Sequence, residues 1–303
     1  MPSASPTPAA LQALKGVRIL SLALNLPGPA ALMRCQAMGA RCVKLEPPAH
    51  PSAPAGATGD PMSQYSPTAY AALHQGMRTV VADLKTDKGQ AILQRELKQA
   101  DVLLTSFRPS ALCKLGLEWK ALHKLYPRLS MVAIFGALGA RAEVPGHDLT
   151  YVAENDLVSG LELPATLYAD MGGSLLVSEA VLQARLQQLQ KGKSVRLEVA
   201  LSDAAAYLGL PRAWGVTAPD AMVGGAHAGY RVYACKNGRV ALAALEPHFA
   251  AALASAAGLA DTSVANMLRP QTQAAIAAFV AGKTRKQLDA LAVAKDIPLH
   301  TLK

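Results

Sequence analysis

Residues 17–48, VRILSLALNLPGPAALMRCQAMGARCVKLEPP, contain the pattern that decides the fold. Two short apolar runs, 17–24 and 41–48, flank a stretch that opens with Pro-Gly-Pro at 27–29. Proline is tolerated in the first turn of a helix because the N–H group it lacks would have no partner there. Gly39 follows at a position typical of a helix end. The segment therefore predicts a strand, a turn, a helix and a second strand.

The same alternation continues to about residue 146. Strands are expected at 79–84, 101–107 and 129–136, and helices at 85–100 and 121–127. Continuously apolar strands that alternate with helices are typical of a parallel sheet covered on both faces. We therefore expect an α/β, Rossmann-like domain, although it carries no GxGxxG fingerprint of a dinucleotide site. Residues 49–68, rich in Pro, Ala, Gly and Ser, predict a long surface loop.

The C-terminal part has a different pattern. A long helix is expected at 172–193, and residues 195–208 predict a strand that runs into a helix. Residues 224–247 predict a β-hairpin around Lys236-Asn237-Gly238, because Asn-Gly favours a tight turn. The remaining residues are Ala-rich and predict helices. The chain is thus expected to form a large domain, residues 1–210, and a smaller α+β domain, residues 211–303.

The composition favours a large cytoplasmic protein. The chain has 303 residues, of which 51% are hydrophobic and 17% charged, enough for a sizeable core. It lacks the roughly 18 consecutive apolar residues of a membrane-spanning helix, and its start lacks the pattern of a signal peptide. The four cysteines are scattered without CxxC or Cys/His spacing, which indicates free thiols and no metal site.

The formal net charge of +9 bears on the ligand. Nucleic-acid modules usually add clustered basic runs or aromatic stacking platforms. Here Lys and Arg are dispersed and aromatic residues make up only 5% of the chain. A small polyanionic ligand, such as a nucleotide or coenzyme, fits better than a nucleic acid. A soluble protein that is merely basic is an equally open interpretation, because net charge concerns solubility and steering.

Three acid–base candidates lie beside helix- or strand-breaking residues. His147 follows Pro145-Gly146, Asp170 precedes Met-Gly-Gly, and Glu246 follows the second hairpin strand. Each has a structural alternative. Asp170 could cap a helix beginning near Gly172, Glu246 could be a solvated carboxylate, and a histidine in a loop is more often a surface residue. Spacing alone does not decide between these interpretations.

A family resemblance bears on that choice. The stretch from 14 to 48 is similar to the opening of the class III CoA-transferase superfamily (CaiB/BaiF type), which includes the α-methylacyl-CoA racemases. The similarity continues in order through MRTVVADLKTDKGQ, ADVLLTSFRPSALCKLGL, PRLSMVAIFG, PGHDLTYV, YADMGGS and GGAHAGYRVYACKNGRVALAALEPHF. It covers nearly the whole chain.

The resemblance implies catalytic roles for His147, Asp170 and Glu246, since racemases keep all three. CoA-transferases resemble them around Asp170, their nucleophile, and generally lack the other two. Inverting the carbon beside a thioester needs one group on each face. His147, oriented by Glu246, would serve one face and Asp170 the other. Backbone N–H groups at a helix start near Gly172 and Gly173 are expected to stabilise the enolate.

The resemblance also implies a site for coenzyme A, which would be part of the substrate, with no tightly bound cofactor. The positions lie at the expected C-terminal ends of parallel strands, where open α/β sheets bind ligands. They are Lys44, Ala82, Asp83, Leu84, Lys85, Thr105, Ser106, Phe107, Arg108, Lys114, Gly146, His147, Asp148 and Tyr151. Lys44 is expected near the phosphates. Lys85 and Lys114 could instead be solvated lysines at helix ends.

The resemblance finally implies an interlocked homodimer, in which Glu246 would come from the partner's small domain. Three functions stay open. The leading one is racemisation or epimerisation of 2-methylacyl-CoA thioesters. The second is CoA transfer between carboxylic acids through an aspartyl mixed anhydride. The third is CoA binding without catalysis. Neither a nucleic-acid nor a membrane partner is expected.

Overall fold

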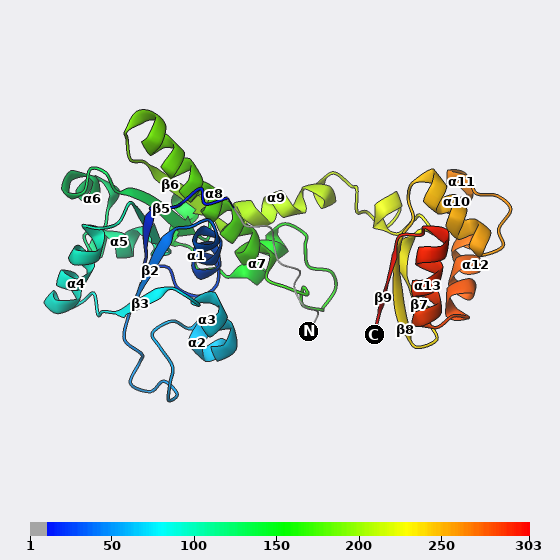
Figure 1. Ribbon diagram of the computed structural model, residues 1–303, viewed down its shortest axis with the longest axis horizontal. Helices are drawn as coiled ribbons and strands as arrows, with labels where there is room; N and C mark the ends of the chain where they lie inside the picture. The colour runs from blue at the N-terminus through cyan, green and yellow to red at the C-terminus, as the bar shows by residue number, and fades with distance from the viewer. Residues whose placement is uncertain (1–10) are drawn as a thin grey trace. The chain divides into compact units, whose positions relative to one another are not determined.

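A computed structural model describes residues 11–303 (Figure 1). The chain forms two compact units, Met1–Gly209 and Leu210–Lys303. Each unit has its own sheet and its own hydrophobic core.

The larger unit is built on a six-stranded sheet in the order β3-β2-β1-β4-β5-β6. Its strands are β1 (Arg18–Ser21), β2 (Arg41–Glu46), β3 (Arg78–Val81), β4 (Val102–Thr105), β5 (Ser130–Phe135) and β6 (Arg196–Ala200). Every neighbouring pair is parallel. In the register, Ile19 of β1 lies between Cys42 of β2 and Val102 of β4. The predicted α/β fold with a parallel sheet is confirmed.

Alternate side chains of each strand enter two separate cores. On one face, Ile19, Leu104 and Ile134 pack with residues of α1 (Pro27–Ala37) and α8 (Tyr168–Lys191). On the other, Leu20, Leu103 and their neighbours pack with α4 (Asp87–Leu97), α5 (Pro109–Lys114) and α6 (Trp119–Leu125). Covering both faces explains why the strands read as continuous apolar runs.

The segment that follows β2 is only partly a loop. The prediction of a loop throughout 49–68 is wrong for its second part, where α2 (Met62–Tyr65) and the start of α3 (Pro67–Leu73) are helical. Ser66 caps α3, because its hydroxyl accepts a hydrogen bond from the N–H of Ala69 at 3.2 Å. The Pro and Ser that suggested a loop are instead residues of a helix start.

Three further elements complete the path to the site. The helix α7 (Asp148–Glu154) follows a short 3₁₀ helix, η1 (Gly139–Glu143), and α9 (Leu201–Ala213) follows β6 directly. The helix α8 begins at Tyr168, four residues before the predicted start, and ends at Gly192, whose φ of +64° is the left-handed conformation that favours glycine. The early start of α8 changes the role expected of Asp170.

The smaller unit has a three-stranded antiparallel sheet in the order β7-β8-β9. Its elements are η2 (Met222–Gly224), β7 (Tyr230–Cys235), β8 (Gly238–Ala243), α10 (Pro247–Ala256), α11 (Val264–Met267), α12 (Pro270–Ala281), α13 (Arg285–Lys295) and β9 (Leu299–Leu302). The hairpin forms as predicted, with Cys235 opposite Gly238. The prediction of helices for the remaining residues is wrong at β9, because four residues with His and Thr among them give no strong strand signal without their partner β8.

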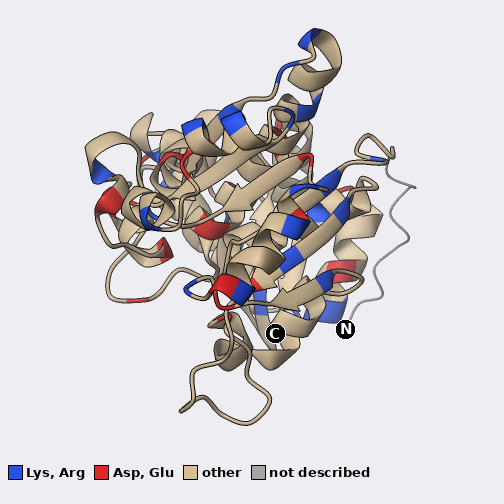
Figure 2. Ribbon diagram, turned by 90° about the vertical axis from the view of Figure 1, so that its left-hand side faces the viewer, with Lys and Arg blue, Asp and Glu red and all other residues tan. Residues whose placement is uncertain are grey.

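Charged side chains are dispersed over the structure. Figure 2 shows Lys and Arg scattered along the ribbon and interspersed with Asp and Glu. Within residues 11–303, no helix combines the length and apolar character needed to cross a membrane.

Candidate active site

A pocket opens where the strand order of the larger sheet reverses. The chain leaves β1 toward one side and β4 toward the other, so the segments that follow these adjacent strands diverge at their carboxyl ends. Open α/β sheets bind ligands at such a point. The pocket is lined by Leu24 and Asn25 after β1, by Ser106 and Arg108 after β4, and by Gly136 after β5. Gly146, His147, Tyr151 and Asp170 also line it.

A second, more apolar pocket adjoins the first. Leu26, Met62, Tyr65, Leu149 and Leu167 contribute to its lining, together with Asp148. Three residues line both pockets: Asn25, His147 and Asp170. A ligand that extended from one pocket into the other would therefore pass these three side chains.

Asp170 lies in the first turn of α8. The residue that caps this helix is Leu167, so the alternative in which Asp170 is the cap is wrong. The N–H of Asp170 donates a hydrogen bond to Oδ1 of Asp148 at 2.9 Å. Burial, and secondarily the negative charge of Asp148, raise the pKa of Asp170 from 3.8 to about 7. Near neutral pH this carboxyl can both accept and donate a proton.

His147 directly precedes α7 and is exposed. Its backbone is fixed from both sides by one side chain. The N–H of His147 donates to Oγ1 of Thr150 at 3.1 Å, and its carbonyl accepts from the Thr150 hydroxyl at 2.7 Å. The backbone that carries the imidazole is therefore fixed, and His147 lines both pockets.

Tyr151 explains two glycines of the site. A Cβ atom at Gly136 would lie 2.1 Å from the Tyr151 hydroxyl, and one at Gly146 would lie 2.6 Å from it. Neither distance is sterically possible, so the tyrosine ring fits only because both positions lack a side chain. Burial raises the pKa of Tyr151, which keeps its phenol protonated.

Similarity to known proteins extends over nearly the whole chain. The model of CoA-transferase family III matches residues 14–303. The chain belongs to CoA-transferase family III. It is 28% identical to the alpha-methylacyl-CoA racemase of Homo sapiens over 91% of this chain and 74% of the racemase. It is 30% identical to the cinnamoyl-CoA:phenyllactate CoA-transferase of Clostridium sporogenes over 63% of this chain and 50% of the transferase.

Solved structures show the same fold. A hypothetical protein of Mycobacterium tuberculosis aligns with a TM-score of 0.79 at 23% identity, covering 96% of this chain and 84% of that one. A CaiB/BaiF family protein of Brucella suis aligns with a TM-score of 0.75 at 21% identity, also covering 96% of this chain and 84% of that one. At these identities the likeness concerns the fold alone.

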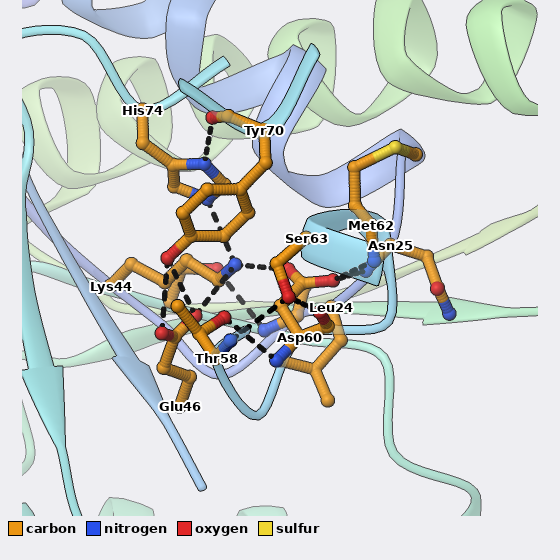
Figure 3. A network of polar contacts seen from close by, with 12 residues as sticks. Leu24, Asn25, Lys44, Glu46, Thr58, Asp60, Met62, Ser63, Tyr70 and His74 are labelled. Carbon is orange, nitrogen blue, oxygen red and sulfur yellow. Dashed lines mark hydrogen bonds and ion pairs between the residues drawn. The ribbon is translucent and has the colours of Figure 1, made fainter. Parts of the chain in front are cut away.

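The structure does not fit the expected contact between Lys44 and the phosphates of CoA. Lys44 is completely buried, and its ammonium group forms an ion pair with Asp60 and a second with Glu46 at 3.2 Å. Figure 3 shows these contacts together with His74. The prediction is wrong because Lys44 lies within β2, not at its end, and points into a closed set of partners.

The other predicted CoA positions divide into two groups. Those that line the two pockets are Ser106, Arg108, Gly146, His147, Asp148 and Tyr151. Those that do not are Ala82, Asp83, Leu84, Lys85, Thr105, Phe107 and Lys114. Thr105 is buried, and its hydroxyl accepts the N–H of Phe107 at 3.2 Å, so it shapes the turn after β4. Lys85 and Lys114 are exposed, and their contact with CoA stays a prediction.

Gly172 and Gly173 are not the helix start that was expected to supply N–H donors. Both lie inside α8, where they allow close packing against α9. A Cβ atom at Gly173 would lie 2.4 Å from Leu201, and one at Gly172 would lie 3.0 Å from Leu208. Their absent side chains serve helix packing, so the expected enolate donors must be sought elsewhere.

Glu246 belongs to the smaller unit, where it is exposed and directly precedes α10. Its participation in the site stays a prediction, as does the interlocked dimer. Among residues 11–303, no three His, Cys, Asp or Glu side chains gather as a metal site.

Asn25 is the site residue that the sequence did not single out. It adopts a φ of +64°, which is uncommon for a residue with a side chain. The available signal was an asparagine between an apolar strand and Pro-Gly-Pro, since Asn tolerates the left-handed conformation better than most residues.

Proposed function

We propose that this protein racemises or epimerises 2-methylacyl-CoA thioesters by removing and returning the α-proton. The observation that carries the proposal is that His147 and Asp170 line the same pocket and that the pKa of Asp170 is raised to about 7. General acid–base catalysis works best when the pKa of the group lies near the working pH. Asp170 then holds and releases a proton with comparable ease, as a reversible exchange requires.

The proton balance of the reaction is simple. In one direction the Asp170 carboxylate takes the α-proton, and the electron pair of the C–H bond moves onto the thioester oxygen as an enolate. His147, in its protonated form, returns a proton to the opposite face of the carbon. In the other direction the roles reverse. Glu246 is expected to orient His147 from a partner subunit, and Arg108 to attract the phosphates of CoA.

A CoA-transferase is the second candidate, because a transferase relative matches the chain at an identity similar to that of the racemase, 30% against 28%, over a smaller part of the chain. In that reaction the Asp170 carboxylate attacks the thioester carbonyl and the C–S bond breaks. CoA leaves as the thiolate and an aspartyl mixed anhydride forms. This chemistry needs Asp170 as a carboxylate and assigns no step to His147.

Proton NMR of a 2-methylacyl-CoA in deuterated water tests the proposal. The wild-type protein is expected to remove the α-proton signal and scramble the configuration. His147→Ala and Asp170→Ala are each expected to slow exchange by roughly 10²–10⁴-fold, the usual contribution of a general acid or base. His50→Ala and Asp220→Ala, at exposed positions outside both pockets, serve as matched controls.

Other outcomes would favour the alternatives. CoA transfer to an added carboxylate without α-proton exchange, lost in Asp170→Ala and kept in His147→Ala, would establish the transferase. Binding of acyl-CoA without either reaction would indicate a non-catalytic protein.

A further inference from the structure

The site needs a donor for the thioester oxygen, and one residue is placed to provide it. Negative charge develops on that oxygen whether an α-proton is removed or a carboxylate attacks the carbonyl, and a fixed hydrogen-bond donor there lowers the barrier. The glycines of α8 do not supply it. Asn25 lines both pockets together with His147 and Asp170, so a ligand that reaches these two residues also passes Asn25.

The backbone of Asn25 is held in an unfavourable conformation by specific partners. Its N–H donates to Oδ1 of Asp60 at 3.0 Å, and the preceding N–H, of Leu24, donates to Oγ of Ser106 at 3.3 Å. Strained residues of this kind persist only where the surrounding structure fixes them, and they concentrate at functional sites. The φ of +64° is therefore imposed on Asn25 by its neighbours.

The anchor of Asn25 is itself fixed by buried charge. Asp60 is fully buried and forms an ion pair with Lys44. Its Oδ1 also accepts the N–H of Met62 at 2.9 Å, so one carboxylate oxygen links the segment after β1 to the start of α2. Figure 3 shows Asn25 at the border of this set of contacts, with its side chain pointing away from them.

The carboxamide of Asn25 is incompletely satisfied. Its Oδ1 is buried and has no hydrogen-bond partner among the described residues. Buried polar atoms usually have partners, and each exception asks for an explanation. An amide that served only to stabilise the loop would turn its polar atoms toward partners. Oδ1 of Asn25 has no partner from residue 11 onward, so this oxygen does not stabilise the loop, and the NH₂ group of the same amide is the donor that Asn25 can offer a ligand.

We propose that the side-chain amide of Asn25 donates a hydrogen bond to the thioester carbonyl oxygen of the substrate and stabilises the enolate that forms there. The proposal rests on the acyl-CoA substrate of the proposed function. It makes Asn25 a catalytic residue, and Asp60 and Lys44 positioning residues that act through its backbone.

Asn25→Gly is the informative variant, because glycine adopts a positive φ without strain, so the variant removes the side chain and its amide without disturbing the backbone conformation. With a 2-methylacyl-CoA, kcat for α-proton exchange is expected to fall by roughly 10²–10³-fold, the effect of removing one oxyanion donor. KM is expected to rise by no more than roughly 2–10-fold, the value of one neutral hydrogen bond in the ground state. Asp296→Gly is the matched control, since Asp296 also has a positive φ, of +52°, and lies in the smaller unit. A rise in KM alone, with kcat unchanged, would overturn the proposal.

A binding experiment separates this proposal from the proposed function. Calorimetry would compare a 2-methylacyl-CoA thioester with the S-alkyl thioether of CoA, in which CH₂ replaces the carbonyl. Asn25→Gly is expected to weaken binding of the thioester by roughly 2–10-fold, the net value of a neutral hydrogen bond, and to leave the thioether unaffected. Equal weakening of both would place the amide on another part of CoA and overturn the proposal, even in a protein that catalyses no exchange.

Discussion

The larger unit contains two groups of buried and half-buried ionisable side chains that are organised in opposite ways. The Lys44 cluster consists of Lys44, Glu46, Asp60, Tyr70 and His74, and in it each carboxylate contacts the ammonium group. The aspartate pair consists of Asp148 and Asp170. In the part of the chain that the structure describes, no Lys, Arg or His lies within 4.0 Å of either carboxylate as an ion pair.

Hydrogen bonding in the Lys44 cluster is closed. Nδ1 of His74 lies 2.6 Å from the carbonyl of Tyr70, which can only accept, so Nδ1 carries the proton. Nε2 is then free to accept from the Lys44 ammonium at 2.8 Å. Burial lowers the pKa of His74, which keeps the ring neutral as this arrangement requires. Such a cluster fixes structure.

Over the described part of the chain, the aspartate pair has no cation to offset its negative charge, and the pKa of Asp170 is about 7. A strongly perturbed group in a pocket is a candidate for catalysis, whereas a paired one is more often structural. Burial alone therefore does not separate a structural group from a catalytic one. The presence or absence of a compensating charge does.

Removing the cation should therefore affect stability most. Lys44→Met leaves two buried carboxylates without their partner, and the free energy of unfolding of the larger unit is expected to fall by about 3–5 kcal/mol. Denaturant titration would measure it. Lys85→Met, at an exposed lysine, is the control and should change stability by less than about 0.5 kcal/mol. A Lys44→Met protein as stable as the wild type would contradict the structural role given to the cluster.

Removing a charge from the aspartate pair should act in the opposite direction. The pKa of Asp170 is higher in the folded protein than its ordinary value of 3.8. Ionising it therefore opposes folding, and wild-type stability is lost as pH rises from about 4 through 7. Asp170→Asn avoids that loss. Relative to the wild type it should gain up to roughly 4 kcal/mol between pH 4 and pH 8, since the pKa rises from 3.8 to about 7 and each pKa unit corresponds to about 1.4 kcal/mol.

Thermal unfolding of the larger unit at several pH values would measure that gain as a difference in Tm between variant and wild type. Other groups titrate in both proteins and cancel in the difference. Asp220→Asn, an exposed residue of the smaller unit, should give a difference that does not depend on pH in this way. If the Tm difference for Asp170→Asn were also independent of pH, the surroundings of Asp170 would not raise its pKa.

The sequence predicted these two groups unequally. The motif around His147 and Asp170 carried a family resemblance, and both residues line the pocket. Lys44 carried the same resemblance, yet its environment depends on Asp60 and His74, which lie 16 and 30 residues away along the chain. Only the folded chain shows that Lys44 meets oppositely charged partners whereas Asp170, among the described residues, does not. The strands and most helices were predictable because their apolar periodicity is local, whereas β9 and the left-handed Asn25 depend on contacts with distant segments.

The smallest expected effect concerns the edge of the Lys44 cluster. The Tyr70 hydroxyl donates to Oε1 of Glu46 at 3.0 Å. Tyr70→Phe removes that bond and keeps the ring, and Glu46 retains its ion pair with Lys44. Loss of one hydrogen bond to a charged group should lower the free energy of unfolding by about 1.5–3 kcal/mol, less than Lys44→Met. Tyr65→Phe, at an exposed tyrosine, is the control in the same denaturant titration. If Tyr70→Phe cost as much as Lys44→Met, the ammonium would not be the centre of the cluster, and the contrast with the aspartate pair would rest on hydrogen bonding instead of charge.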